Sequence, residues 1–170
     1  MKQIYLLRHA KSEWDEPYDT DLDRSLSRRG RIQSKALRDY LKESRFEFDQ
    51  CFVSPAERTL KTYSSLRKEI LRFPKPEISE NLYDADKEDL MFVLHGLSPS
   101  TRSVCLVGHN PSLEAFGSAL VLGDKEQSLF HKFPTASFLG LSFSDDSWKN
   151  LSWGSCQLVV FWIPGQIGKE

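Results

Sequence analysis

The sequence lacks the features that mark membrane-spanning and disulfide-rich proteins. Its longest apolar run, Leu158–Ile163, is far shorter than the roughly 20 residues that a membrane-spanning helix needs. The 3 cysteines among 170 residues are too few and too widely spaced for a disulfide framework or a metal cluster. Because Cys51, Cys105 and Cys156 each lie in an apolar stretch, we expect buried free thiols.

The chain also lacks a net charge of either sign. Its 23 basic and 24 acidic residues give a formal net charge of -1, so no global positive field favours nucleic acid. No basic stretch followed by an apolar segment, as in a signal peptide, opens the sequence. We therefore expect a cytoplasmic protein with no nucleic-acid partner and no membrane association.

Charge is nevertheless distributed unevenly along the first part of the chain. The segment Glu13–Asp23 contains six acids and no base, whereas Arg24–Arg45 contains eight bases and two acids. A solvated loop followed by a solvated helix face explains this pattern. A docking surface for a charged protein partner is the alternative interpretation.

Apolar residues are abundant enough for a core. Hydrophobic residues make up 39% of the chain and aromatic residues 12%, so a chain of this length needs no disulfide or metal to fold. We expect one domain, residues 1–170.

Short apolar runs alternate with amphipathic stretches along the sequence. Strands are expected at Gln3–Leu7, Cys51–Val53, Val104–Val107, Ser137–Phe143 and Gln157–Ile163, with Glu77–Tyr83 as a connector or short strand. Helices are expected after Ser27, after Pro55, over Leu90–Leu97 and over Leu113–Val121. This alternation predicts a three-layer α/β sandwich with a mainly parallel sheet and helices on both faces.

Cationic and hydrogen-bonding side chains follow three of the predicted strands. These are Arg8 and His9 after the first strand, Arg58 in the first helical turn after the second, and His109 after a later strand. Ligands of open α/β sheets bind at the carboxyl ends of the strands, so we expect these side chains to surround one pocket. Paired guanidinium donors and helix N-termini both favour phosphate there. Each residue taken alone has a structural explanation.

The residues around these junctions resemble the motifs of a known family. Leu6–Trp14 resembles the Arg-His-Gly signature of the histidine phosphatase superfamily, which has the phosphoglycerate mutase-like fold. Ser54–Thr59 is similar to its Ser-Pro-x-x-Arg-Ala motif, and Val107–Pro111 to its third motif, a Gly-His pair after a strand. The likeness spans Lys2–Ile163 in family order. The short length, Gly-His-Asn-Pro and Pro134–Ser137 look most like the small SixA-type phosphohistidine phosphatases.

The resemblance implies a role for each junction residue. His9 is then the nucleophile, which forms a covalent phosphohistidine that water hydrolyses. Arg8, Arg58 and His109 hold the phosphoryl oxygens, and neither a metal nor another cofactor is needed. We expect protein phosphohistidine as substrate. The alternatives are a small phosphoester, such as a sugar phosphate or nucleotide, and a non-catalytic phosphate-binding domain.

A general acid is the least defined part of the predicted site. Glu80 is the best match to the carboxylate that protonates the leaving oxygen in larger relatives, and Asp84 is second. Either is equally well explained as a surface carboxylate. Imidazole leaves as a neutral ring more easily than an alkoxide leaves, so a phosphohistidine substrate needs less help from an acid.

Two residues near the first motif depart from the family pattern. Ala10 stands in place of the usual glycine, and Asp15 stands where many larger relatives carry an asparagine that contacts phosphate. An acid there repels the substrate unless it turns away or is paired. His95 and His131 lie outside the motifs and are expected to be structural.

Overall fold

A computed structural model describes residues 1–70 and 72–165 of the chain. Its centre is a six-stranded sheet with the strand order β3-β2-β4-β1-β5-β6. The strands are β1 (Lys2–Arg8), β2 (Gln50–Val53), β3 (Pro76–Ile78), β4 (Ser103–Gly108), β5 (Phe138–Phe143) and β6 (Cys156–Trp162). Neighbours among β1 to β4 are parallel, whereas β5 is antiparallel to β1, and β6 to β5. The predicted, mainly parallel sheet is confirmed.

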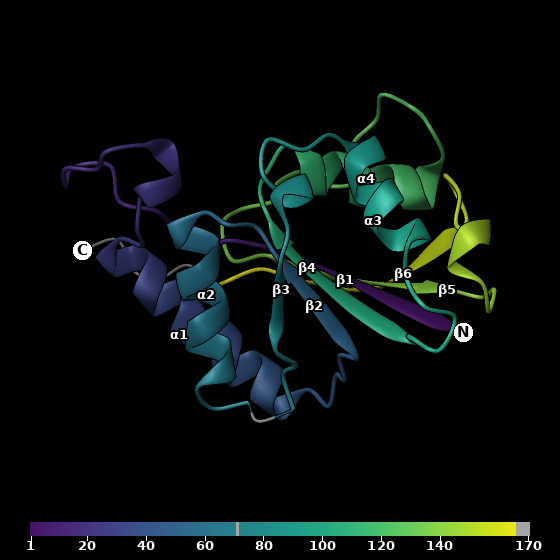
Figure 1. Ribbon diagram of the computed structural model, residues 1–170, viewed down its shortest axis with the longest axis horizontal. Helices are drawn as coiled ribbons and strands as arrows, with labels where there is room; N and C mark the ends of the chain where they lie inside the picture. Colours follow the sequence, from purple (N-terminus) through teal and green to yellow (C-terminus); the bar gives the residue numbers. More distant parts are fainter. Residues whose placement is uncertain (71, 166–170) are drawn as a thin grey trace.

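Two pairs of helices cover the sheet. They are α1 (Arg28–Glu43), α2 (Glu57–Arg67), α3 (Lys87–His95) and α4 (Ser112–Leu122). The pair α1 and α2 lies on one face, and α3 and α4 lie on the other (Figure 1). This is the three-layer arrangement expected from the sequence. Within the described ranges, no helix has the length and apolar character needed to cross a membrane.

The apolar run of β1 serves two cores at once. Ile4 and Leu6 pack into the core under α3 and α4, whereas Tyr5 and Leu7 pack into the core under α1 and α2. Successive side chains of a strand point to opposite faces, so a strand buried on both faces has no polar alternation. This explains why the sequence here reads as continuously hydrophobic. All three cysteines are free and buried, as predicted.

The parallel strands end together at one edge of the sheet. Arg8 of β1 is in register with Gly108 of β4, and the backbone N–H of His9 donates to the Gly108 carbonyl over 3.0 Å. On the other side of β4, the N–H of Ser54 donates to the Val107 carbonyl over 3.0 Å. The residues that follow β1, β2 and β4 therefore converge on a single edge.

Strand β5 begins where β1 ends, and this explains its antiparallel direction. The N–H of Arg8 donates to the carbonyl of Ser137, just before β5. The segment 123–137, which follows α4, thus brings the chain back to the carboxyl edge of the parallel strands. Strand β5 starts there and therefore runs in the opposite direction to β1. The same return places residues before β5 next to the end of β1.

The start of α1 is fixed against the loop that follows His9. Ser27 caps the helix by accepting from the N–H of Gly30 over 3.1 Å, and its own N–H donates to the Lys11 carbonyl over 3.0 Å. A Cβ atom at Gly30 would lie 2.0 Å from the Lys11 carbonyl oxygen. Only glycine allows this approach of helix to loop.

Replacing Gly30 by alanine should lower the free energy of unfolding by about 2 kcal/mol or more, because backbone must move to admit the methyl group. The measurement is urea unfolding followed by circular dichroism. Gly96→Ala is the matched control, since its nearest neighbour atom would lie at an ordinary 3.5 Å. Equal losses in the two variants would show that the contact with Lys11 is unimportant.

Candidate active site

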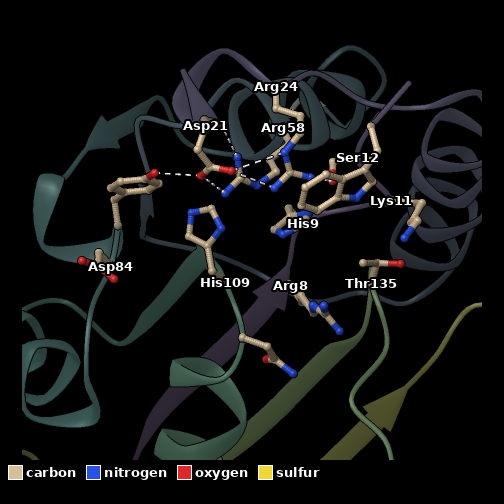
Figure 2. Close-up of a pocket in the computed structure, with 13 residues that line it drawn as sticks. Arg8, His9, Lys11, Ser12, Asp21, Arg24, Arg58, Asp84, His109 and Thr135 are labelled. Atoms are coloured by element: carbon tan, nitrogen blue, oxygen red, sulfur yellow. Dashed lines mark hydrogen bonds and ion pairs between the residues drawn. The ribbon is translucent and has the colours of Figure 1, made fainter. Parts of the chain in front are cut away.

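A cavity of about 330 Å³ opens at the carboxyl edge of the parallel strands. Its lining residues are Arg8, His9, Lys11, Ser12, Trp14, Asp21, Arg24, Arg58, Tyr83, Asp84, His109, Asn110 and Thr135. The four side chains singled out at the strand ends, Arg8, His9, Arg58 and His109, are all among them. Figure 2 shows the rings of His9 and His109 facing each other, with Arg8 and Arg58 on opposite sides of them.

His9 is held in a single orientation. The residue is only 8% exposed, and its ring Nδ1 lies 2.7 Å from the carbonyl oxygen of Ala10. A carbonyl oxygen only accepts hydrogen bonds, so Nδ1 carries the proton and Nε2 keeps a free lone pair. Burial lowers the pKa of His9 to about 3, and the nearby charges of Arg58 and Arg8 act in the same direction. The ring is neutral at physiological pH.

His109 provides the facing ring, 5.1 Å from that of His9 between centroids. Its Nε2 lies 2.7 Å from Oγ of Ser54, a fully buried residue at the end of β2. Burial also lowers the pKa of His109, to about 4, and the charge of Arg58 contributes. The hydroxyl fixes the ring beside the cavity.

Neither ring should gain a proton as the pH falls from about 8 to about 5, because a lowered pKa preserves the neutral form at lower pH. The measurement is ¹⁵N imidazole NMR, with signals assigned by single His9→Gln and His109→Gln spectra. In the unfolded chain both rings bind protons near pH 6.5, so these groups also reduce folding stability as the pH falls below that value. A titration midpoint near 6.5 for either folded ring would contradict the prediction.

The two arginines each keep a donor unused. Nη1 of Arg8 donates to the carbonyl of Phe133 over 2.7 Å. Arg58 is 5% exposed and donates from Nη1 to the Asp21 carbonyl over 2.8 Å and from Nη2 to its carboxylate over 2.9 Å. The Nε groups of Arg8 and Arg58 are buried and have no hydrogen-bond partner among the described residues. Both arginines line the cavity, and guanidinium groups there are suited to binding an incoming anion.

Asp21 organises one side of the cavity. Besides Arg58, its carboxylate accepts from Tyr83 Oη over 2.8 Å and from Arg24 Nη2 over 2.9 Å. Burial alone raises the pKa of Asp21, but the hydrogen bonds from Tyr83, Arg24 and Arg58 outweigh it and keep the pKa well below its usual value. Asp21 is therefore a fixed anion. It lies in the acidic segment that we interpreted as a solvated loop, and no motif distinguished it from its neighbours.

The predicted acids have different positions. Glu80 is exposed, on the 3₁₀ turn Glu80–Leu82, and does not line the cavity. Asp84 does line it, and a left-handed backbone conformation with φ of 52° turns the chain at this point. Asp15 is exposed and outside the lining, so the structure turns this acid away from the cavity.

The other two histidines lie apart from the cavity. Nε2 of His95 lies 2.9 Å from the carbonyl oxygen of Leu151. This hydrogen bond agrees with the structural role expected for His95. His131 is exposed and does not line the cavity. In the part of the chain that the structure describes, no three histidine, cysteine or carboxylate side chains are grouped as a metal ion requires.

Comparison with known proteins identifies the family. A sequence model of the histidine phosphatase superfamily (branch 1) matches residues 4–90. The chain belongs to the histidine phosphatase superfamily. The matched residues contain two of the three motifs recognised in the sequence, those with Arg8, His9 and Arg58, and His109 lies beyond them.

Similar proteins of known structure share the complete fold. A structure described as a candidate phosphohistidine phosphatase SixA from Agrobacterium tumefaciens is 27% identical, with a TM-score of 0.80 over 96% of this chain and 98% of that one. The protein histidine phosphatase SixA complexed with tungstate matches with a TM-score of 0.79 and 20% identity over 95% and 97% of the two chains. An uncharacterised protein of Mycobacterium leprae is 26% identical over 93% of this chain and 99% of its own. The predicted phosphoglycerate mutase-like fold is confirmed.

Proposed function

We propose that this protein is a phosphatase that transfers a phosphoryl group first to His9 and then to water. The observation that carries the proposal is the state of His9, a neutral buried ring with Nε2 free, in a cavity that Arg8 and Arg58 also line. A phosphoryl group needs an in-line nucleophile and preorganised positive charge, and little else from the protein.

The reaction has two steps in this proposal. The lone pair of His9 Nε2 forms a bond to phosphorus while the bond to the leaving group breaks, and the guanidinium groups of Arg8 and Arg58 bind the equatorial oxygens. His109, neutral and fixed by Ser54, donates a hydrogen bond to an oxygen of the same phosphoryl group. Water then attacks the phosphohistidine, releases inorganic phosphate and restores the neutral ring. No metal or other cofactor takes part.

Protein phosphohistidine is the proposed substrate. When its P–N bond breaks, the electron pair goes to the imidazole, which leaves neutral once its other nitrogen carries a proton taken from solvent. Such a substrate needs no strong acid, and the site supports this choice because Asp21 is held ionised and Glu80 lies outside the cavity. The solved relatives described as SixA phosphatases support it as well.

One observation favours the small phosphoester as a second substrate class. Asp84 is a lining residue, and a carboxyl group is the type of group that protonates a departing alkoxide. Efficient ester hydrolysis that falls in Asp84→Asn would support this alternative.

The test is a turnover assay in EDTA with a phosphohistidine peptide and a panel of small phosphoesters. We expect hydrolysis of phosphohistidine that persists in the chelator and is lost in His9→Ala. His131→Ala is the matched control, since His131 is an exposed histidine outside the cavity. Preference for an ester would change the substrate class, and no turnover of any substrate would overturn the proposal.

A further inference from the structure

Trp14 is an exposed aromatic residue at the mouth of the cavity. It lines the same space as His9 and yet leaves 59% of its surface open to solvent. A ligand that covers such a ring gains the free energy of burying its apolar surface. Neither step of the proposed reaction uses this ring.

The indole is held in place from one side. The guanidinium carbon of Arg24 lies 3.6 Å from the centroid of the Trp14 ring, a cation–π contact. Arg24 is itself buried and fixed, because it donates to the Ser12 hydroxyl and to the Asp21 carboxylate. The backbone N–H of Trp14 donates to the Glu13 carboxylate over 2.9 Å. One face of the indole is thus covered by an ordered cation, and the exposed part of the ring is preorganised.

Such a ring suits a planar group better than a flexible one. Aromatic rings in offset or edge contact gain about 0.5–1.5 kcal/mol beyond their buried area. His9 and Trp14 line the same cavity of about 330 Å³, so a substrate whose phosphoryl group meets His9 can present its leaving group to the indole.

We propose that Trp14 forms a stacking subsite for the planar leaving group of the substrate, the imidazole ring of a phosphohistidine. This inference rests on the proposed function and deepens it, since it assigns a residue that selects ring-bearing phosphoramidates. The subsite contributes to binding of the imidazole ring. The transfer of the phosphoryl group to His9 follows the same steps with or without it.

The test compares two substrates that share a P–N bond. A phosphohistidine peptide carries the ring, whereas phosphoramidate releases ammonia and has none. In Trp14→Leu we expect the ratio of the two kcat/KM values to fall about 5-fold to 10-fold, mainly through KM for the peptide. Trp14→Phe retains an aromatic face and should keep the ratio within about 3-fold of the original.

Phe92→Leu is the matched control. Phe92 is an exposed aromatic residue on α3 that does not line the cavity, so its removal should leave the ratio unchanged. Equal loss on both substrates in Trp14→Leu would show that the indole only supports the loop, and would overturn the subsite while the phosphatase function stands. Failure of the unmodified protein to hydrolyse the peptide would overturn both.

Discussion

Replacing His9 by alanine is expected to lower kcat/KM by about 10⁴-fold or more, the order seen when a covalent nucleophile is removed. Among the described side chains that line the cavity, only His9 has a neutral ring whose proton is fixed on Nδ1, which leaves Nε2 free to attack. The facing ring of His109 does not replace it, because its Nε2 is engaged by the Ser54 hydroxyl. Binding of phosphate by the arginines remains in the variant, but the covalent step is lost.

The covalent step can be measured separately from turnover. Brief exposure to a ³²P-labelled substrate, followed by denaturation, should leave label on the unmodified protein that is stable in base and released in acid. His9→Ala should carry no label, and His9→Gln, which fills more of the buried space, should behave in the same way. Far-UV circular dichroism checks that both variants fold. Label that persists in either variant would move the nucleophile to another residue.

The convergence of the strand-end residues could be predicted because it depends on topology alone. Parallel neighbouring strands place their carboxyl ends at one edge, so residues directly after β1 and β4, such as His9 and His109, must meet. Arg58 follows from the same rule, since it lies in the first turn of the helix after β2. The positions of the motifs relative to the predicted strands are therefore enough to predict this part of the site.

The rest of the site depends on the path of a loop that has no periodic pattern. Asp21, Arg24 and Trp14 lie between β1 and α1, where only tertiary contacts decide which of many charged residues turns inward. The 3₁₀ turn Glu80–Leu82 likewise decides which of the two predicted acids reaches the cavity. It leaves Glu80 outside the cavity lining and brings Asp84, a few residues later, to the cavity. Which carboxylate reaches the cavity therefore depends on the geometry of this turn, which the residue pattern does not specify.

Replacing Arg58 by alanine is expected to lower kcat/KM by at least about 10²-fold, the range for removal of one preorganised transition-state donor. Arg58 is buried and lines the cavity, and two of its nitrogens are held by Asp21, so its guanidinium group is fixed before substrate arrives. Arg58→Lys should recover little of the loss, because an ammonium lacks the fork that contacts Asp21 and a phosphoryl oxygen together. Steady-state kinetics measure both effects, and unchanged kinetics in Arg58→Ala would refute the assignment.

The contacts between Asp21 and Arg58 predict that replacing Asp21 changes kcat/KM in opposite directions in the presence and in the absence of Arg58. In the unmodified protein, Asp21→Asn should lower kcat/KM about 10-fold, because the Arg58 guanidinium loses the charged partner that orients it. In the Arg58→Ala background the same substitution should raise kcat/KM, because Asp21 then faces the phosphoryl group with one countercharge fewer. A double-mutant cycle on these two positions detects the reversal. Additive losses would show that Asp21 acts independently of Arg58, through Arg24 or Tyr83 alone.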